Sequence, residues 1–189
     1  MADEVWLLRH AETEWSRDGK HTGRSDIPLT DEGREAARRL GERLADVHFA
    51  LVLCSPLSRA RETAQLARLE CSGVRDDLLE WDYGDDEGRT SEDIREERPG
   101  WSIWSDGPKN GEPIAHVAVR AERVIDRALG AGGDVLAFAH GHIFRVLASR
   151  WIELPAAGGA RLALGAGTVC VLGYERETQV IRLWNEPPR

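Results

Sequence analysis

Histidine or arginine follows each of three short apolar runs in the sequence. The runs span residues 4–9, 50–54 and 135–139, and each reads as a buried strand. Open α/β sheets bind ligands at the carboxyl ends of their strands, so parallel strands would bring these residues to one edge. One such residue alone is more often structural, whereas coincidence at three strand ends indicates a site. The residues concerned are Arg9, His10, Arg59 and His140.

A phosphoryl group suits this set of side chains. The planar arginine fork binds two phosphate oxygens at once and stays charged at any working pH. A neutral imidazole between two arginines can attack phosphorus, and the positive charges lower its pKa, which keeps a lone pair available. The second imidazole can donate a hydrogen bond to the oxygens that carry charge during transfer.

The leaving oxygen also needs a proton, and the richest group of carboxylates lies at residues 80–88 (EWDYGDDEG). Crowded carboxylates raise one another's pKa, so one of them can stay protonated near neutral pH and act as a general acid. For most of these residues a solvated acidic turn is the simpler interpretation. A loop for a divalent cation is the other alternative, but the spacing does not fit the EF-hand pattern, so we predict no metal site.

Helical patterns alternate with the apolar runs. Two further runs at residues 168–174 and 180–184 predict a terminal hairpin or edge pair. Strands that alternate with helices of this length predict an α/β fold with a mostly parallel sheet covered on both faces. The predicted helices span residues 30–46, 57–67, 114–128 and 142–151.

The chain of 189 residues has the length of one domain. No repeat or linker divides it, so we expect a single domain over residues 1–189. The segment 81–113 differs from the rest, because it is acidic and rich in glycine, proline and tryptophan. It has one short helical pattern, near residues 91–97, and we predict a lid-like excursion laid over the domain.

Composition narrows the classes of partner. The net charge is −8 and no basic tract occurs, which argues against nucleic acid and anionic membranes as partners. No apolar run approaches the length of a membrane span, and the acidic N-terminus is untypical of a secretory signal. The three cysteines are widely spaced, so neither a disulfide framework nor a zinc site is indicated, and we expect a cytoplasmic protein.

Several blocks of sequence, in order along the chain, resemble the histidine phosphatase superfamily in its phosphoglycerate-mutase-like branch. Residues 8–13 (LRHAET) are similar to the family motif R-H-G-E-[ST]. The resemblance implies a three-layer α/β/α sandwich and a phosphohistidine intermediate, with no cofactor and no metal required. The other blocks are Thr22-Gly23, Leu29-Thr30-x-x-Gly33, Ser55-Pro56-x-x-Arg59-Ala60-x-x-Thr63, Glu80-x-x-Tyr83-Gly84-x-x-Glu87-Gly88, Asn110-Gly111-Glu112 and His140-Gly141-His142.

The resemblance also implies roles for single residues. His10 would be the nucleophile, and Glu80 would be the acid that later activates water. Arg9, Arg59 and His140 would line the phosphate pocket. The positions that match the substrate side are Ser16, Thr22, Gly23, Tyr83, Gly141, His142 and Arg145.

Two residues depart from the family pattern. Ala11 stands where the motif usually has glycine, which should crowd the turn and leave the chemistry intact. Ser16 stands where the mutases carry asparagine, and this exchange is more similar to the acid phosphatases and the sedoheptulose-bisphosphatase type. The mutases also tend to carry a longer segment between the positions of Glu80 and His140.

We therefore predict a metal-independent phosphomonoester hydrolase that acts on a small phosphorylated metabolite, such as a sugar phosphate or bisphosphate. A cofactor-dependent phosphoglycerate mutase is the first alternative. A module that binds phosphorylated ligands without turning them over is the second, and the presence of a nucleophile together with an acid counts against it. A C-terminal edge strand could support a homodimer.

The remaining polar and aromatic residues have simpler interpretations. His21, His48 and His116 match no catalytic position and read as surface or structural residues. His142 reads as a pocket edge or helix cap rather than one half of a metal pair. Lys109 could meet a second phosphate, but a solvated loop lysine is the simpler interpretation. The tryptophans read mainly as packing residues, although one in segment 81–113 could shape the entrance to the pocket.

Overall fold

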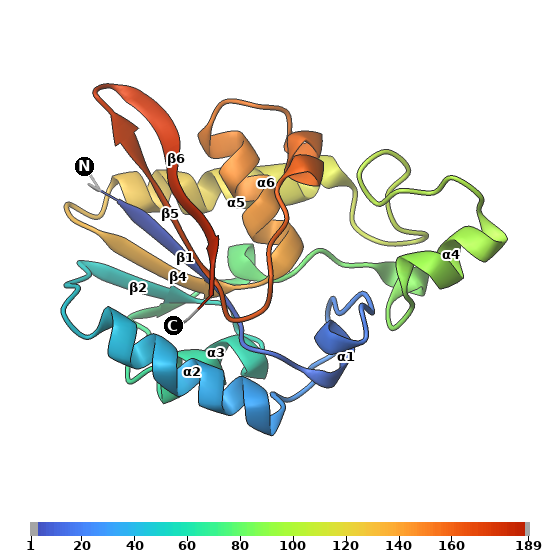
Figure 1. The fold of residues 1–189 in the computed structure, drawn as a ribbon. Helices are drawn as coiled ribbons and strands as arrows, with labels where there is room; N and C mark the ends of the chain where they lie inside the picture. Colours follow the sequence, from blue (N-terminus) through green and yellow to red (C-terminus); the bar gives the residue numbers. More distant parts are fainter. Residues whose placement is uncertain (1–3, 188–189) are drawn as a thin grey trace.

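The computed structural model describes residues 4–187, and its centre is a six-stranded sheet with the order β3-β2-β4-β1-β5-β6 (Figure 1). β1 to β4 pair in parallel, whereas β5 runs antiparallel to both β1 and β6. All five predicted strands are confirmed, and the two-residue β3 was too short to predict. The strands are β1 (Val5–Arg9), β2 (Leu51–Cys54), β3 (Gly73–Val74), β4 (Val135–Ala139), β5 (Val169–Glu175) and β6 (Thr178–Glu186).

Helices cover both faces of the sheet, which confirms the three-layer α/β/α class (Figure 1). α2 (Asp31–Leu44) and α3 (Ser58–Leu66) lie on one face, and α5 (Ile114–Leu129) and α6 (Gly141–Trp151) on the other. All four helical patterns are therefore confirmed. None of the helices in residues 4–187 is both long and apolar enough to cross a membrane.

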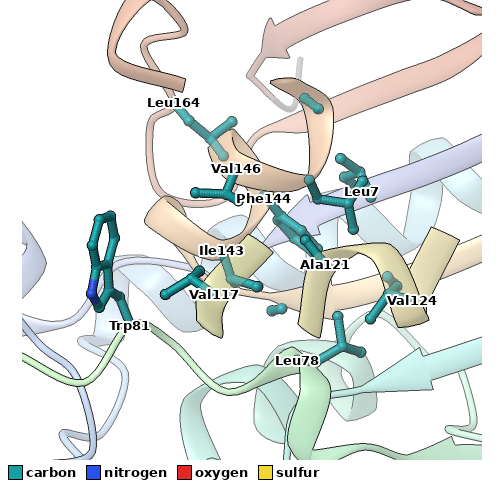
Figure 2. Close-up of a cluster of buried hydrophobic side chains, with 14 of the residues drawn as sticks. Leu7, Leu78, Trp81, Val117, Ala121, Val124, Ile143, Phe144, Val146 and Leu164 are labelled. Carbon is teal, nitrogen blue, oxygen red and sulfur yellow. The ribbon is translucent and has the colours of Figure 1, made fainter. Parts of the chain in front are cut away.

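The alternation of side chains along the strands divides the core into two halves. Leu7 of β1 packs into the cluster that α5 and α6 share, whereas the next residue, Leu8, packs into the cluster under α2 and α3. Figure 2 shows the first half, where Phe144 and Ile143 of α6 lie between the sheet and Val117 of α5. Burying each such side chain contributes about 1.5–3 kcal/mol, so this packing stabilises the first turn of α6 against the sheet.

The segment 81–113 is anchored to the domain by its own buried residues. Trp81, Ile94 and Trp101 are all buried in the main core cluster. The indole nitrogen of Trp81 donates to the carbonyl of Glu112 at 2.6 Å. The short helix is confirmed as α4 (Ser91–Glu97). The tryptophans of this segment therefore act in packing, while its movement as a lid stays a prediction, as does the division of the chain into domains.

The acidic stretch 80–88 is not the crowded cluster that the sequence suggested. Asp86 is buried and pairs with Arg98. Glu87 accepts a hydrogen bond from the backbone of Ser25 at 2.5 Å. Each carboxylate thus has its own structural partner. The interpretation of the stretch as a solvated turn is therefore wrong for Asp86 and Glu87, because distant segments of the chain pack against their carboxylates.

Cys54 and Cys71 form a disulfide, which corrects the prediction that no disulfide is present. Cys54 ends β2, and Cys71 precedes β3, which pairs in parallel with β2. No pattern in the sequence predicted this pairing, because β3 is too short to mark where the chain returns to the sheet. Cys170 keeps a free thiol, and burial raises its pKa to about 12.

We expect the disulfide to stabilise the fold by closing a loop of 17 residues. The variant Cys71→Ser should lose about 3 kcal/mol of the free energy of unfolding in urea, because the unfolded chain regains the freedom of that loop. Adding dithiothreitol should lower the wild type to the same value and leave the variant unchanged. Equal urea midpoints for the wild type with and without the reductant would contradict this prediction.

Candidate active site

The carboxyl ends of β1 and β4 meet the start of α6 at a cavity of about 290 Å³. Larger hollows, of 310, 490 and 740 Å³, lie beside α2 and α3 and are lined by none of the predicted site residues. The sequence predicted most of the lining, whereas Arg59, His140 and Gly23 lie outside it. The predicted residues that line the cavity are Arg9, His10, Ser16, Thr22, Glu80, Tyr83, Gly141, His142 and Arg145.

His10 lies directly after β1 with its ring buried and its orientation fixed. Its Nδ1 lies 2.8 Å from the carbonyl oxygen of Ala11. A carbonyl can only accept, so Nδ1 carries the proton and Nε2 keeps the lone pair. Burial holds the pKa of His10 well below its usual value, and the positive charges of Arg59 and Arg9 lower it further. The ring is therefore a neutral nucleophile at any pH near 7.

Arg9 has the geometry of an anion-binding group. Its Nη1 donates to the carbonyl of Leu164 at 2.5 Å, whereas its Nε is buried without a protein partner. A buried donor that lacks a partner is costly, and a bound anion would satisfy it. Gly141 allows this approach, because a Cβ at that position would lie 3.3 Å from the Arg9 guanidinium.

Arg59 and His140 lie behind His10 rather than on the cavity wall. Arg59 is fully buried, and its guanidinium donates to the backbone carbonyls of residues 22, 23 and 25 at 2.7–3.1 Å. Its Nε donates to Nδ1 of His140 at 3.2 Å, so the proton of that ring is on Nε2, 2.7 Å from Ser55 Oγ. The rings of His10 and His140 are 5.2 Å apart. Arg59 thus positions the loop that carries Thr22 and Gly23.

Hydrogen bonds from backbone amides hold the Glu80 carboxylate in place. Its Oε1 accepts hydrogen bonds from the amides of Trp81 and Ile143, both at 2.9 Å. Its Oε2 accepts from the amide of His142 at 3.0 Å. The last two amides belong to the first turn of α6, where the helix dipole favours a negative charge. This contact fixes the carboxylate at the cavity.

The substrate-side residues divide into two groups. Ser16 lies in α1 (Glu14–Arg17) and closes a capping box with Thr13, which orients its hydroxyl. Thr22 donates to the carbonyl of Lys20 at 3.2 Å. In the second group, the phenol oxygen of Tyr83 lies 2.6 Å from Nδ1 of His142. Arg145 lines the cavity from the next turn of α6.

Sequence reasoning missed five residues of the lining, namely Gly19, Lys20, His21, Ser91 and Leu164. His21 is only 8% exposed, and its ring lies 4.8 Å from that of Tyr83. Its position beside Thr22 was the one available signal. The interpretation as a surface residue holds for His48 and His116, which are both exposed. Lys109 does not line the cavity; its ammonium pairs with Asp85.

The burial of His21 predicts a loss of stability in acid. Burial lowers its pKa from 6.5 to about 4. The unfolded chain therefore binds more protons between those pH values, and the cost is absent above pH 6.5 and grows as the pH falls toward 4. We expect about 2 kcal/mol of the pH-dependent loss at pH 5 to disappear in His21→Gln, measured by urea unfolding between pH 7 and 5. His48→Gln is the exposed control, and equal slopes for His21→Gln and the wild type would refute the prediction.

Comparison with known proteins agrees with this geometry. An acid phosphatase of Mycobacterium tuberculosis is 40% identical over 188 residues, 96% of this chain and 93% of that protein. A sedoheptulose 1,7-bisphosphatase of Saccharomyces cerevisiae is 36% identical over 182 residues, 78% of this chain and 67% of that protein. The solved structure of an open reading frame product from M. tuberculosis superimposes with a TM-score of 0.96 at 37% identity and covers all of both chains.

Proteins named probable phosphoglycerate mutase also match, at 29–30% identity, below the two phosphatases. Residues 5–187 match the histidine phosphatase superfamily (branch 1). The match spans every described strand and includes the cavity with its buried histidines. The chain therefore belongs to branch 1 of the histidine phosphatase superfamily.

Proposed function

We propose that this protein hydrolyses phosphomonoesters of small metabolites through a phosphohistidine on His10. The observation that carries the proposal is the fixed tautomer of His10, whose Nε2 keeps its lone pair in the cavity that Arg9, with its unsatisfied Nε, also lines. Such a ring can attack phosphorus while the guanidinium binds its oxygens. The family and the names of its most similar relatives support a phosphatase over a mutase.

The reaction would proceed in two steps. In the first, Nε2 of His10 attacks phosphorus in line, and the bond to the leaving oxygen breaks. Glu80 enters this step protonated, gives its proton to that oxygen and becomes the carboxylate. In the second, the Glu80 carboxylate takes a proton from water, and the oxygen of that water attacks the phosphohistidine. Inorganic phosphate leaves and His10 regains its lone pair.

The remaining site residues would stabilise charge and hold the substrate. We propose that Arg59 and His140 act on the phosphoryl group from behind His10, where both already lie within the same buried network. Ser16, Thr22, Tyr83, Gly141, His142 and Arg145 would surround the substrate from the cavity lining, and Gly23 would support this lining from outside it. The cavity of about 290 Å³ suits a small phosphorylated metabolite.

Partners and location stay predictions. A homodimer would use the outer edge of β6, which is the edge strand on that side of the sheet. The Cys54–Cys71 disulfide counts against a cytoplasmic location, because structural disulfides are rare in a reducing compartment. Trapping free thiols with an alkylating agent at cell lysis would decide the point, since a cytoplasmic protein should label at Cys71.

Phosphate release from a panel of metabolites tests the function. The panel contains p-nitrophenyl phosphate, sugar phosphates and bisphosphates, 3-phosphoglycerate and phosphorylated amino acids, each assayed from pH 5 to 8. Release from at least one metabolite is expected. Isomerisation of 3-phosphoglycerate with 2,3-bisphosphoglycerate present, without net phosphate release, would instead identify a mutase, and binding without either reaction would identify a binding module.

Turnover is expected to continue in EDTA. The proposed nucleophile, acid and anion-binding groups are all protein side chains, so no step is assigned to a metal. The measurement is phosphate release with the chelator present and absent, with magnesium added back as the control. Complete loss in EDTA that magnesium restores would refute the metal-independent mechanism.

A further inference from the structure

Tyr83, His142 and Arg145 form a hydrogen-bonded chain along one wall of the cavity. The phenol oxygen of Tyr83 lies 2.6 Å from Nδ1 of His142, and Nη1 of Arg145 lies 3.4 Å from Nε2 of the same ring. All three side chains line the cavity that holds His10. Both ring nitrogens of His142 are therefore engaged, one by each neighbour.

The guanidinium of Arg145 is fixed by contacts on its other sides. Its Nε donates to the carbonyl of Gly159 at 3.0 Å, and its Nη2 donates to the carbonyl of Ala160 at 3.4 Å. The group also lies over the ring of Trp104, 4.6 Å from the centroid. These contacts leave Nη1 directed at the imidazole.

The direction of the chain follows from what each group can do. Arginine has only donors, so Nε2 of His142 must accept the hydrogen bond. The proton of the neutral ring is then on Nδ1, and Nδ1 donates to the phenol oxygen of Tyr83. The opposite tautomer would place a proton on Nε2, where it would face the N–H donor of Arg145. A protonated ring would also carry a proton on Nε2, and its positive charge would lie beside the Arg145 cation.

The Tyr83 hydroxyl therefore accepts a hydrogen bond from His142 and does not donate its own proton to that ring. Among residues 4–187, Tyr83 Oη has no hydrogen-bond partner besides that ring. We propose that Arg145 and His142 are positioning residues that make the Tyr83 hydroxyl a hydrogen-bond donor to an oxygen of the phosphorylated substrate. That the substrate is phosphorylated rests on the proposed function. The direction of the hydrogen bonds does not.

The charges around the chain agree with this direction. Burial and the charge of Glu80 hold the pKa of Tyr83 well above its usual value, so the phenol keeps its proton. Burial and then Arg145 hold the pKa of His142 well below its usual value, so its ring stays neutral. The phenol and the imidazole are therefore both neutral in the wild type.

Nitrogen-15 NMR of labelled histidine tests the chain without any turnover. In the wild type we expect the ring of His142, assigned by its loss in His142→Asn, to be neutral with the proton on Nδ1. In Arg145→Met, which removes the donor at similar length, part of the ring should move its proton to Nε2. A wild-type ring with the proton on Nε2, or an Arg145→Met ring that is unchanged, would overturn the proposal.

A double-mutant cycle tests whether His142 affects turnover through the Tyr83 hydroxyl. Tyr83→Phe should lower kcat/KM for p-nitrophenyl phosphate about 10- to 100-fold, because a hydrogen bond to a charged oxygen is lost. His142→Ala should lower it by a similar factor, although its backbone amide still donates to Glu80. In the Tyr83→Phe background, His142→Ala should change kcat/KM less than about twofold.

Two further variants separate this proposal from a structural role of His142 and from the proposed function. His142→Asn keeps an N–H near the position of Nδ1 and should recover most of the activity that His142→Ala loses. Equal effects of His142→Ala in both backgrounds would overturn the assignment, since His142 would then act independently of Tyr83. Full turnover in His10→Ala, with the expected ring tautomer, would instead refute the proposed function and leave the direction of the chain standing.

Discussion

Replacing His10 with alanine is expected to lower phosphate release more than 100-fold for every substrate of the panel. In the proposed mechanism the ring supplies the nucleophile that forms the covalent intermediate, so its removal abolishes the first step. The measurement is kcat/KM for p-nitrophenyl phosphate and for the best metabolite. Retention of more than about a hundredth of the wild-type rate would end the assignment of His10.

The chain offers matched controls for this variant. His48→Ala and His116→Ala remove exposed imidazoles that lie outside the cavity, so both should keep wild-type rates. Trapping is an independent measurement: rapid alkaline quenching of the wild type during turnover should retain phosphate on the protein, because phosphohistidine is stable in alkali. His10→Ala should retain none under the same conditions.

Glu80→Gln is expected to separate the two steps of the reaction. The leaving group of p-nitrophenyl phosphate needs little protonation, so the first step should remain fast enough to release about one equivalent of nitrophenol per protein. The second step needs the carboxylate to take a proton from water, and steady-state turnover should fall more than 100-fold. For alkyl phosphates, which need the acid, no such burst is expected.

The structure supplies both the reason for this effect and its control. The three backbone amides that donate to the Glu80 carboxylate would face an amide nitrogen in part of the glutamine variant, so the change affects position as well as proton transfer. Asp85→Asn changes an exposed carboxylate of the same acidic stretch and should leave the rate unchanged. Unaltered steady-state turnover in Glu80→Gln would exclude Glu80 as the base.

One electrostatic arrangement connects these expected results. His10, His140 and His142 are all held neutral, chiefly by burial, while Arg9, Arg59 and Arg145 supply positive charge. Each ring then has one donor and one acceptor nitrogen, and its neighbours fix which is which. The site can thus bind a dianion without losing the lone pair that attacks it.

The sequence by itself determined the layers of the fold and the position of the proposed nucleophile. Continuous apolar runs in the strands, and apolar positions with a period near 3.6 in the helices, are local properties, so β1, β4 and α5 were predictable to within about two residues. Parallel strands end at one edge, which is sufficient to bring His10 near His140. The resemblance of the blocks to one family added the role of Glu80.

Only the tertiary structure decided which partner each polar group meets. The Cys54–Cys71 pairing depends on the two-residue β3, and the burial of His21 depends on Tyr83 and Trp101 from a distant segment. The tautomers of the histidines depend on single carbonyls and guanidinium groups brought from elsewhere in the chain. The pattern of apolar residues along the sequence predicts which residues are buried. Hydrogen bonds and pKa values depend instead on neighbours that are distant in the sequence and that only the tertiary fold brings into contact.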